Sequence, residues 1–197
     1  MSGFPLGRPA RIAVFASGRG SNLEALLKAF PPENPLGHIV LVVSDKADAG
    51  ALEKAVRAGV EAVHIPWPKG GRQQFEQAAL QLLAERHVDL VLLAGFMRLL
   101  SPAFVEPWMG RILNIHPSLL PNFPGLHAQK QALEARAQES GCTVHFVDTG
   151  MDTGPIILQR RVPVFPDDTE ETLSARILAE EHQAYPEAVR RVLMGQK

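Results

Sequence analysis

The sequence is poor in the features that mark disulfide-bonded, membrane-bound or nucleic-acid-binding proteins. Its 197 residues include one cysteine, Cys142, which excludes an internal disulfide and a metal cluster built on cysteines. No segment approaches the roughly 18 consecutive apolar residues of a membrane-spanning helix, and residues 1–9 lack the apolar core of a signal peptide. With 20 Lys and Arg against 21 Asp and Glu, the formal net charge is −1, and no basic run favours nucleic acid. We therefore expect a cytoplasmic protein without a nucleic-acid or membrane partner.

Three common cofactor-binding motifs are missing as well. None of the 7 histidines shows the His-x-x-x-His spacing of many metal sites, so we expect no catalytic metal. The glycine turn at residues 18–20 is not followed by Gly-Lys-Ser/Thr, which excludes a P-loop. It is not the dinucleotide-binding fingerprint either, because Leu23 occupies the third glycine position.

The remaining composition, 46% hydrophobic and 21% charged residues, is ordinary for a soluble globular protein. A chain of this length forms one domain or a tight pair of lobes with a sizeable core. Cys142 stands among Thr143, Val144 and Phe146, which predicts a buried core thiol rather than a nucleophile.

The first half of the chain alternates apolar runs with segments of helical periodicity. Continuous apolar runs are typical of strands in a sheet covered on both faces. A strand followed by a helix, four times over, predicts a right-handed parallel sheet, with the most apolar run, residues 89–94, at its centre. The expected strands are residues 11–16, 38–44, 60–65 and 89–94; the expected helices start at Ser21, span 49–58 and 72–86, and start again at Pro102 after an N-cap at Ser101.

The second half contains three further apolar runs. The last two are close in sequence, so we expect them to pair antiparallel. Asp168 with Glu171 is expected to cap a long final helix, which Pro186 would break or kink. The expected strands are residues 111–116, 142–147 and 155–162, with a helix over 128–137.

The turn after the first strand has the features of an anion site. Residues 17–22 read Ser-Gly-Arg-Gly-Ser-Asn, and Ser21 with Glu24 matches a capping box, which makes Ser21 the expected N-cap. Backbone N–H groups and the helix dipole at such a terminus attract phosphate, and a monophosphate fits this short turn best. The alternative is a plain strand-to-helix turn.

The stretch from Arg111 to His127 is the most distinctive in the chain. Pro117 favours an extended conformation for His116, so the strand should place Asn114 and His116 on one face and Ile115 on the other. The carboxyl end of a parallel strand is where ligands bind in open sheets. An amide and an imidazole there can both donate to an oxyanion in acyl transfer. The alternative is that Asn114 ends a strand and His116 satisfies a loop.

An acidic residue from the loop at residues 148–154 would complete such a site. A carboxylate beside His116 would fix the orientation of its ring and could hold a proton-carrying water. Asp152 is the better candidate for this acidic residue, and Asp148 is the alternative. Pro124-Gly125 suits the middle of a type II turn that folds the intervening loop back.

Several motifs resemble the folate-dependent phosphoribosylglycinamide formyltransferases of purine synthesis. The longest is Asn-Ile-His-Pro-Ser-Leu-Leu-Pro-Asn-Phe-Pro-Gly-Leu-His at residues 114–127. The resemblance covers nearly the whole chain. Its other blocks are Gly-Arg-Gly-Ser-Asn (18–22), Ala-Gly-Phe-Met-Arg (94–98), Leu-Ser-Pro-Ala-Phe (100–104), Val-His-Phe-Val (144–147), Asp-Thr-Gly-Pro-Ile-Ile-Leu-Gln (152–159) and the Glu-His-x-x-Tyr-Pro of 181–186.

The resemblance implies a Rossmann-like α/β fold, a mostly parallel sheet of about seven strands flanked by helices, with its last strand region antiparallel. It implies one formyltransferase domain over residues 1–197, with a phosphate- and nucleotide-binding half (10–110) and a folate-binding and catalytic half (111–197). The implied reaction transfers the formyl group of the co-substrate 10-formyltetrahydrofolate to the primary amine of glycinamide ribonucleotide, so the expected partners are small molecules.

The resemblance also implies a role for each matching residue. Asn114, His116 and Asp152 correspond to the catalytic set, and Glu181 to a contact with the substrate amine or ribose. The substrate phosphate would bind at Gly20, Ser21 and Asn22. The folate would bind at Arg72, Phe96, Met97, Arg98, Leu100, Val147 and Asp148.

Two departures from the family pattern stand out. Thr153 replaces a glycine that is common after the catalytic aspartate, and Asp45 places an acid near the phosphate half. The nearest rival activity is hydrolysis of the formyl-folate, although such hydrolases usually carry an additional N-terminal domain. A methionyl-tRNA formyltransferase would need a longer chain with a basic module. A non-catalytic binder of phosphorylated ligands on the same fold is the rival from another class.

Overall fold

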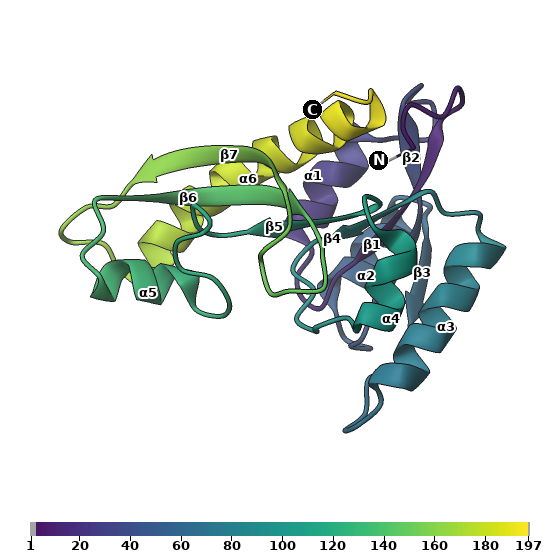
Figure 1. Ribbon diagram of the computed structural model, residues 1–197, viewed down its shortest axis with the longest axis horizontal. Helices are drawn as coiled ribbons and strands as arrows, with labels where there is room; N and C mark the ends of the chain where they lie inside the picture. Colours follow the sequence, from purple (N-terminus) through teal and green to yellow (C-terminus); the bar gives the residue numbers. More distant parts are fainter. Residues whose placement is uncertain (1–2, 197) are drawn as a thin grey trace.

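A single twisted sheet of seven strands runs through the computed structural model, which describes residues 3–196 (Figure 1). Residues 1, 2 and 197, the outermost of the predicted domain, lie outside the described residues. The strand order is β3-β2-β1-β4-β5-β6-β7, so β4 is central, as predicted. The strands are β1 (Ala10–Phe15), β2 (Gly37–Ser44), β3 (Glu61–His64), β4 (Leu90–Leu93), β5 (Ile112–His116), β6 (Glu139–Phe146) and β7 (Ile156–Pro163).

The strands from β3 to β5 are parallel, whereas β6 and β7 join antiparallel. The prediction of a mostly parallel α/β sheet with an antiparallel last region is therefore confirmed. The described helices are α1 (Ser21–Ala29), α2 (Gly50–Arg57), α3 (Arg72–Glu85), α4 (Pro102–Val105), the 3₁₀ turn η1 (Glu106–Trp108), α5 (Ala128–Glu134) and α6 (Glu170–Leu193). Among residues 3–196, no helix is long and apolar enough to cross a membrane.

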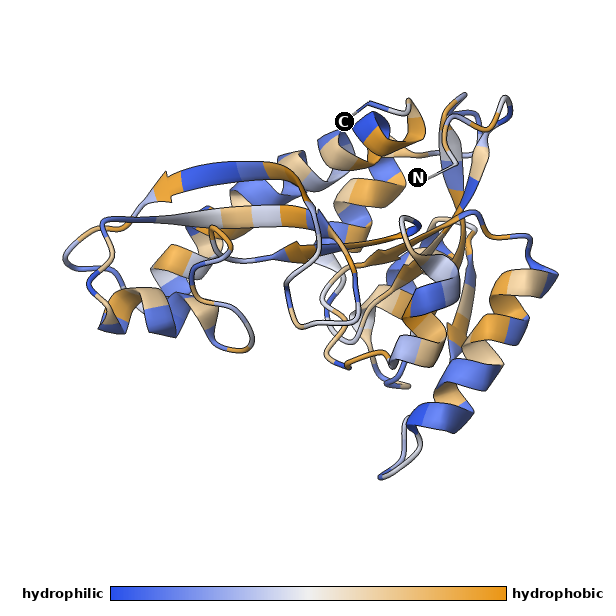
Figure 2. Cartoon of the chain, viewed as in Figure 1, coloured by the Kyte–Doolittle hydropathy of each residue, from blue (hydrophilic) through white to orange (hydrophobic). Residues whose placement is uncertain are grey.

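Two hydrophobic cores, one on each face of the sheet, explain why the inner strands are continuously apolar. Alternate residues of β1 divide between them: Ile12 and Val14 pack with α1, α2 and α6, while Ala13 and Phe15 pack with α3 and α4. Hydropathy colouring shows the same concentration of apolar residues along the inner strands (Figure 2). Cys142 belongs to the first core and is fully buried, as predicted, and burial raises the pKa of its thiol to about 12.

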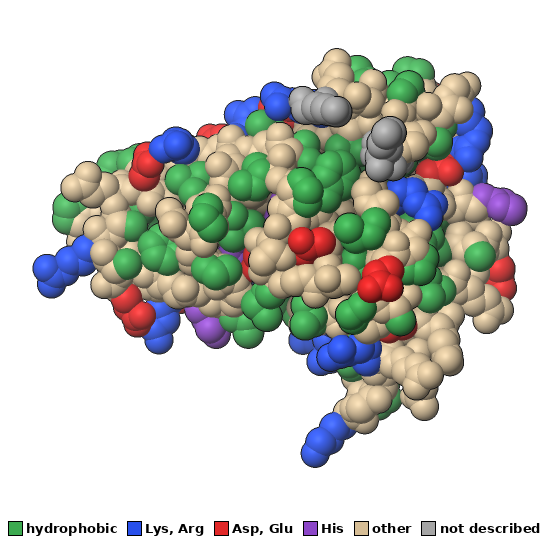
Figure 3. Space-filling view, in the orientation of Figure 1, with side chains coloured by type: hydrophobic (Ala, Val, Ile, Leu, Met, Phe, Trp, Pro, Cys, Tyr) green, Lys and Arg blue, Asp and Glu red, His purple; other side chains and the backbone are tan. Residues whose placement is uncertain are grey.

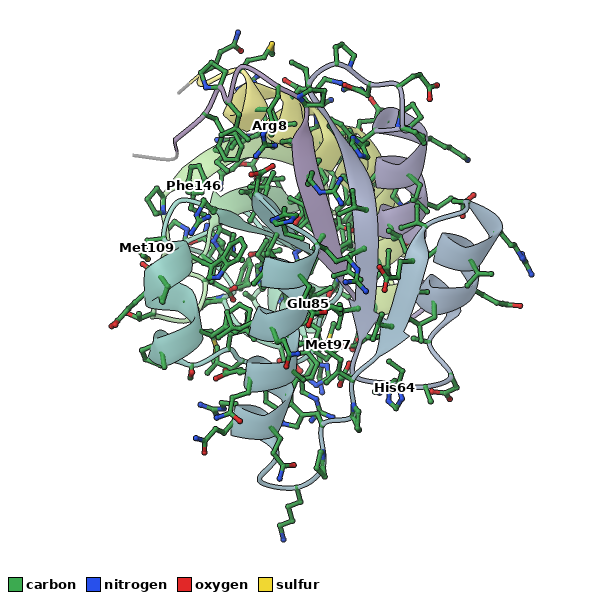
Figure 4. The ribbon with its side chains drawn as sticks, turned by 90° about the vertical axis from the view of Figure 1, so that its right-hand side faces the viewer. Arg8, His64, Glu85, Met97, Met109 and Phe146 are labelled. Carbon is green, nitrogen blue, oxygen red and sulfur yellow. The ribbon has the colours of Figure 1, made fainter. Side chains whose placement is uncertain are left out.

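The parallel strands give the molecule two distinct ends. Arg8, just before β1, and Met97, just after β4, lie at opposite ends of the sheet (Figure 4). The carboxyl ends of β1, β4 and β5 therefore share the end at which Met97 lies.

The ends of the helices differ from the sequence-based expectations. Gly20, in a left-handed conformation, is the N-cap of α1, so Ser21 is already helical and its side chain makes no cap bond. The N-cap of α6 is Thr169, whose side chain accepts from the Thr172 N–H, because Asp168 is held by an ion pair with Arg176. Each predicted capping box was therefore wrong about the capping residue.

One predicted helix was too long, and one of the two alternatives for the final helix, a break, was wrong. The final helix does not break at Pro186 but continues to Leu193, because the residues beyond it, such as Val189, remain packed in the core. The helix predicted over residues 128–137 ends at Glu134, since Arg136 adopts a left-handed conformation with φ of 50°.

Tyr185 connects α6 to the strand ends that carry the polar residues. Its side chain is fully buried, and its hydroxyl lies 2.9 Å from the carbonyl oxygen of Leu93 on β4 and 3.1 Å from that of Leu113 on β5. The hydroxyl thereby satisfies backbone groups at the place where Asn114 leaves the core.

We expect Tyr185→Phe to lower the free energy of unfolding by about 1–3 kcal/mol, because two buried carbonyl oxygens lose the single hydroxyl hydrogen that they share. Urea unfolding measures this change, and Thr149→Val, which removes an exposed hydroxyl, is the control. An unchanged unfolding midpoint for Tyr185→Phe would show that the hydroxyl does not hold these strands.

Candidate active site

The carboxyl end of β5 presents polar side chains on one face of the sheet. Leu113 and Ile115 belong to the core beneath α1 and α6, so Asn114 and His116 project from the opposite face. His116 is 6% exposed, and its Nε2 lies 2.9 Å from the carbonyl oxygen of Phe123, an atom that can only accept. His116 therefore donates from Nε2, and its Nδ1 faces away from Phe123.

The predicted residues Asn114, His116 and Asp152 lie together, joined by a fourth residue, His145. His116 Nδ1 lies 3.4 Å from Asp152 Oδ2. The other carboxylate oxygen, Oδ1, lies 3.8 Å from His145 Nε2, which in turn lies 3.3 Å from Asn114 Nδ2. The four side chains form a continuous polar series, with one carboxylate between two imidazoles.

Asp152 is held by its backbone as well as by its neighbours. It adopts a left-handed conformation with φ of 54°, which aspartate tolerates better than most residues. The N–H of Gly125 donates to Asp152 Oδ2 at 2.8 Å, and Gly125 itself has φ of 75°, as a type II turn requires. A Cβ atom at Gly154 would overlap the Phe146 carbonyl oxygen, so only glycine lets this loop lie so close to β6.

The Thr153 departure changes the loop directly. Its hydroxyl donates to Asp148 Oδ1 at 2.6 Å, and the same oxygen accepts the Gly150 N–H at 2.9 Å. A glycine at position 153 would make no side-chain bond, so in this chain Thr153 ties Asp148 into the loop.

A cavity of about 120 Å³ opens beside Asn114, His145 and Asp152. Of the residues predicted to bind folate, five line it and two do not. Met97 is 63% exposed, and Arg72 is exposed at the start of α3. The lining residues are Leu93, Phe96, Arg98, Leu99, Leu100, Asn114, His145, Val147, Asp148, Gly150, Met151 and Asp152.

Asp45 supports this cavity and does not leave an unpaired negative charge near the predicted phosphate site. Its carboxylate is fully buried and accepts from Ser17 Oγ at 2.6 Å and from Arg98 Nε at 2.7 Å. Ser17 Oγ also accepts the N–H of Met97 at 2.9 Å. The acid is therefore paired with a cation, and it fixes the loop after β4 that supplies Arg98 to the cavity.

The start of α1 has the geometry of an anion site, although Ser21 does not cap it. Gly20 has φ of 76°, and a Cβ there would lie 2.8 Å from the Cα of Ala51 at the start of α2. The N-termini of α1 and α2 thus meet at this turn, and both dipoles favour negative charge there.

Glu181 of α6 lies against the same turn. It is 6% exposed, and Asn22 Nδ2 donates to its Oε2 at 3.0 Å. Burial raises the pKa of Glu181 to about 7, despite the opposing effect of this hydrogen bond. Near neutral pH its carboxyl group can therefore both donate and accept.

A larger groove of about 740 Å³ lies between α1 and α6 but contains none of the polar series around Asp152. Its charged side chains largely pair with one another, as Arg160 does with Glu187 at 2.6 Å and Lys28 with Glu24 at 3.3 Å. On the face drawn in Figure 3, basic side chains are scattered around the outline instead of forming one patch. Within residues 3–196, no group of three His, Cys, Asp or Glu side chains is placed to hold a metal ion.

The family profile described as formyl transferase matches residues 10–189, nearly the whole of this architecture. The chain belongs to the formyl transferase family. It is 50% identical over 190 residues to the trifunctional purine biosynthetic protein adenosine-3 of Drosophila pseudoobscura pseudoobscura, covering 94% of this chain and 14% of that protein. The chain thus spans about one seventh of that relative's length.

Shorter relatives match over most of their length. The phosphoribosylglycinamide formyltransferase of Escherichia coli (strain K12) is 47% identical over 177 residues, covering 89% of this chain and 83% of that protein. The crystal structure of glycinamide ribonucleotide transformylase 1 from Symbiobacterium toebii superimposes with a TM-score of 0.89 at 50% identity, covering 96% of this chain and 90% of that chain. The predicted membership of a formyltransferase family is confirmed.

His145 is the member of this polar series that was not predicted. Its strand was recognised, but its role depends on register, because antiparallel pairing places His145 directly opposite Asn114. The signal in the sequence was the alternation Thr143, His145 in an otherwise apolar strand, which puts both polar side chains on the Asn114 face.

We expect the stability of the protein to depend on pH through Glu181. The folded protein keeps this proton up to about pH 7, whereas the unfolded chain loses it near the ordinary value of 4.5. The stability linked to the bound proton is therefore fully present below pH 4.5 and is lost as pH rises through 7. Relative to the parent, Glu181→Gln should gain on the order of 3 kcal/mol across this interval.

Urea unfolding at a series of pH values measures the difference. Glu171→Gln, on the exposed first turn of α6, is the control for removing a carboxylate from the same helix. Parallel stability curves for the parent and Glu181→Gln would contradict the raised pKa.

Proposed function

We propose that the chain transfers the formyl group of 10-formyltetrahydrofolate to the primary amine of glycinamide ribonucleotide. The observation that carries the proposal is the arrangement at one end of the sheet. A polar series of Asn114, His145, Asp152 and His116 borders a cavity. The start of α1, where Gly20 approaches the start of α2, lies beside the buried Glu181. Relatives named as phosphoribosylglycinamide formyltransferases, similar over most of their length, support the same reaction.

The polar series suits attack of an amine on a formyl carbon. The amine nitrogen forms a bond to that carbon, and the carbonyl oxygen becomes an oxyanion that Asn114 stabilises through its amide N–H. The bond from the carbon to the folate nitrogen then breaks. The proton lost by the amine passes through Asp152 and a water molecule to the departing nitrogen. With a proton on both ring nitrogens, His116 would donate from Nδ1 toward Asp152 Oδ2, 3.4 Å away, and steady the carboxylate through this transfer.

The ribonucleotide would be held by the start of α1. The phosphate accepts from backbone N–H groups at Gly20, Ser21 and Asn22, where the dipoles of α1 and α2 converge. The carboxyl group of Glu181, partly protonated near neutral pH, contacts the ribose or the glycinamide amine. Holding the substrate by its distant phosphate brings the amine to the formyl carbon at high effective concentration.

The folate would occupy the cavity beneath the loop after β4. Phe96, Leu100 and Val147 supply apolar contacts. Arg98, held by Asp45, and Asp148, held by Thr153, supply charges in fixed positions. The exposed Met97 and Arg72 would contact the outer part of the folate, where it extends beyond the cavity. Both substrates are small molecules, and the proposed setting is the cytoplasm.

Formyl transfer is measured by following the products of 10-formyltetrahydrofolate with and without glycinamide ribonucleotide. We expect slow consumption alone and a steep rise on addition of the ribonucleotide, with one formylated ribonucleotide formed per folate consumed, because a positioned amine outcompetes water. Release of free formate at a rate indifferent to the ribonucleotide would instead identify a hydrolase.

We expect a negative charge at position 21 to weaken ribonucleotide binding specifically. Ser21 is the first residue of α1, where an aspartate is compatible with the helix dipole, so the fold should tolerate Ser21→Asp. Repulsion of the phosphate should raise KM for the ribonucleotide by about tenfold, corresponding to about 1.4 kcal/mol. The KM for the folate should stay within about twofold, since its cavity lies elsewhere.

The matched control is Ser21→Asn, which has nearly the same shape as Ser21→Asp but no charge. It should remain close to the parent in both KM values. Equal KM values for the Asp and Asn variants would place the phosphate away from α1.

A further inference from the structure

The hydrogen-bond partners of His145 determine which of its ring nitrogens carries a proton. Its side chain is 2% exposed, with Nδ1 2.9 Å from the Phe146 carbonyl oxygen. A carbonyl oxygen can only accept, so Nδ1 must carry the hydrogen. In the neutral ring, Nε2 then has a lone pair and can only accept.

The acceptor at Nε2 in turn fixes the carboxamide of Asn114. The two side chains face each other across the antiparallel pair β5–β6, with 3.3 Å between Asn114 Nδ2 and His145 Nε2. Only the amide nitrogen of Asn114 can satisfy this lone pair, so the opposite amide orientation would set two acceptors against each other. One N–H of Asn114 is therefore used by His145, and the second N–H is free at the edge of the cavity that both residues line.

The surroundings keep the His145 ring neutral. Burial lowers its pKa, and nearby His116 acts in the same direction. The hydrogen bond to the Phe146 backbone, and then the carboxylates of Asp152 and Asp148, oppose this shift in the pKa, but burial dominates. Asp152 Oδ1 is 3.8 Å from Nε2, too far for a hydrogen bond that would compete with Asn114.

We propose that His145 is a positioning residue for formyl transfer, which holds the Asn114 carboxamide in the orientation that directs an N–H toward the oxyanion. The inference deepens the proposed function and rests on it. A protonated His145 would present an N–H to Asn114, and the amide would have to turn over and offer its oxygen instead. The donor to the oxyanion would then point the wrong way.

A double-mutant cycle tests whether His145 acts through Asn114. We expect Asn114→Ala to lower kcat by at least about a hundredfold, as loss of an oxyanion donor does. His145→Leu replaces the acceptor with an apolar side chain that can still be buried, and should lower kcat by about tenfold or more with little change in either KM. In the Asn114→Ala background, His145→Leu should cause no further loss beyond about twofold, because the amide that it orients is already absent.

His145→Gln is the conservative variant, because its side-chain oxygen can reach the position of the ring Nε2 and accept from Asn114. It should recover most of the activity that His145→Leu loses. Any one of three results would overturn the inference. The loss of kcat in the double variant could equal the product of the two single losses. His145→Leu could keep the parental kcat, or His145→Gln could be no more active than His145→Leu.

A second measurement is made on the parent protein, so it requires neither an activity assay nor a correctly folded variant. In the unliganded parent labelled with ¹⁵N-histidine, the His145 signals should show a neutral ring with its proton on Nδ1 at neutral pH. A proton on Nε2, or a charged ring, would overturn the inference. If the parent itself transferred no formyl group, the proposed function would fail, and the tautomer would still decide the geometry around Asn114.

Discussion

The register of one antiparallel strand pair organises the whole candidate site. The sheet is parallel up to β5, and there the direction changes, with Asn114 set opposite His145 and His116 opposite Thr143. β6 runs back along β5 and ends opposite Leu113, and the loop that follows it folds back beside the polar residues. Asp152 can therefore reach both imidazoles. A slip of one residue would turn Asn114's partner into an apolar side chain.

The acids of the site, of which Asp45 and Glu181 are buried and Asp152 is partly buried, are stabilised in three different ways. Asp45 is paired with Arg98 and Ser17, Glu181 retains its proton to about pH 7, and Asp152 accepts a backbone N–H from Gly125. Each solution avoids an unpaired charge in a low-dielectric interior. Each also ties the site to a different element, so that β2, α6 and the loop around Gly125 all contribute to one arrangement.

Most of the architecture could be predicted from apolar periodicity, because strands covered on both faces leave long hydrophobic runs such as 89–94. Asn114, His116 and Asp152 could be proposed because strand period, proline effects and a family resemblance agreed. His145 could not be proposed, because its pairing with Asn114 depends on the register of the two strands, which the sequence alone does not specify. The predicted N-caps were wrong for a local reason. Gly20 and Thr169 occupy the cap positions, although the adjacent Ser21 and Asp168 match the capping-box pattern better. The position of Asp45 beside the cavity could not be predicted either, because it depends on an ion pair with Arg98, which is distant in the sequence.

We propose that one continuous site holds the phosphate of the ribonucleotide at one end and the formyl group of the folate at the other, and a crystal structure with both ligands would reveal this arrangement. Glycinamide ribonucleotide would be bound together with an unreactive folate analogue that retains the formyl-bearing region. We expect the phosphate at the start of α1 and the primary amine beside Asn114, within about 3.5 Å of the carbon that would carry the formyl group. A phosphate bound away from Gly20, or an amine remote from Asn114 and Asp152, would contradict it.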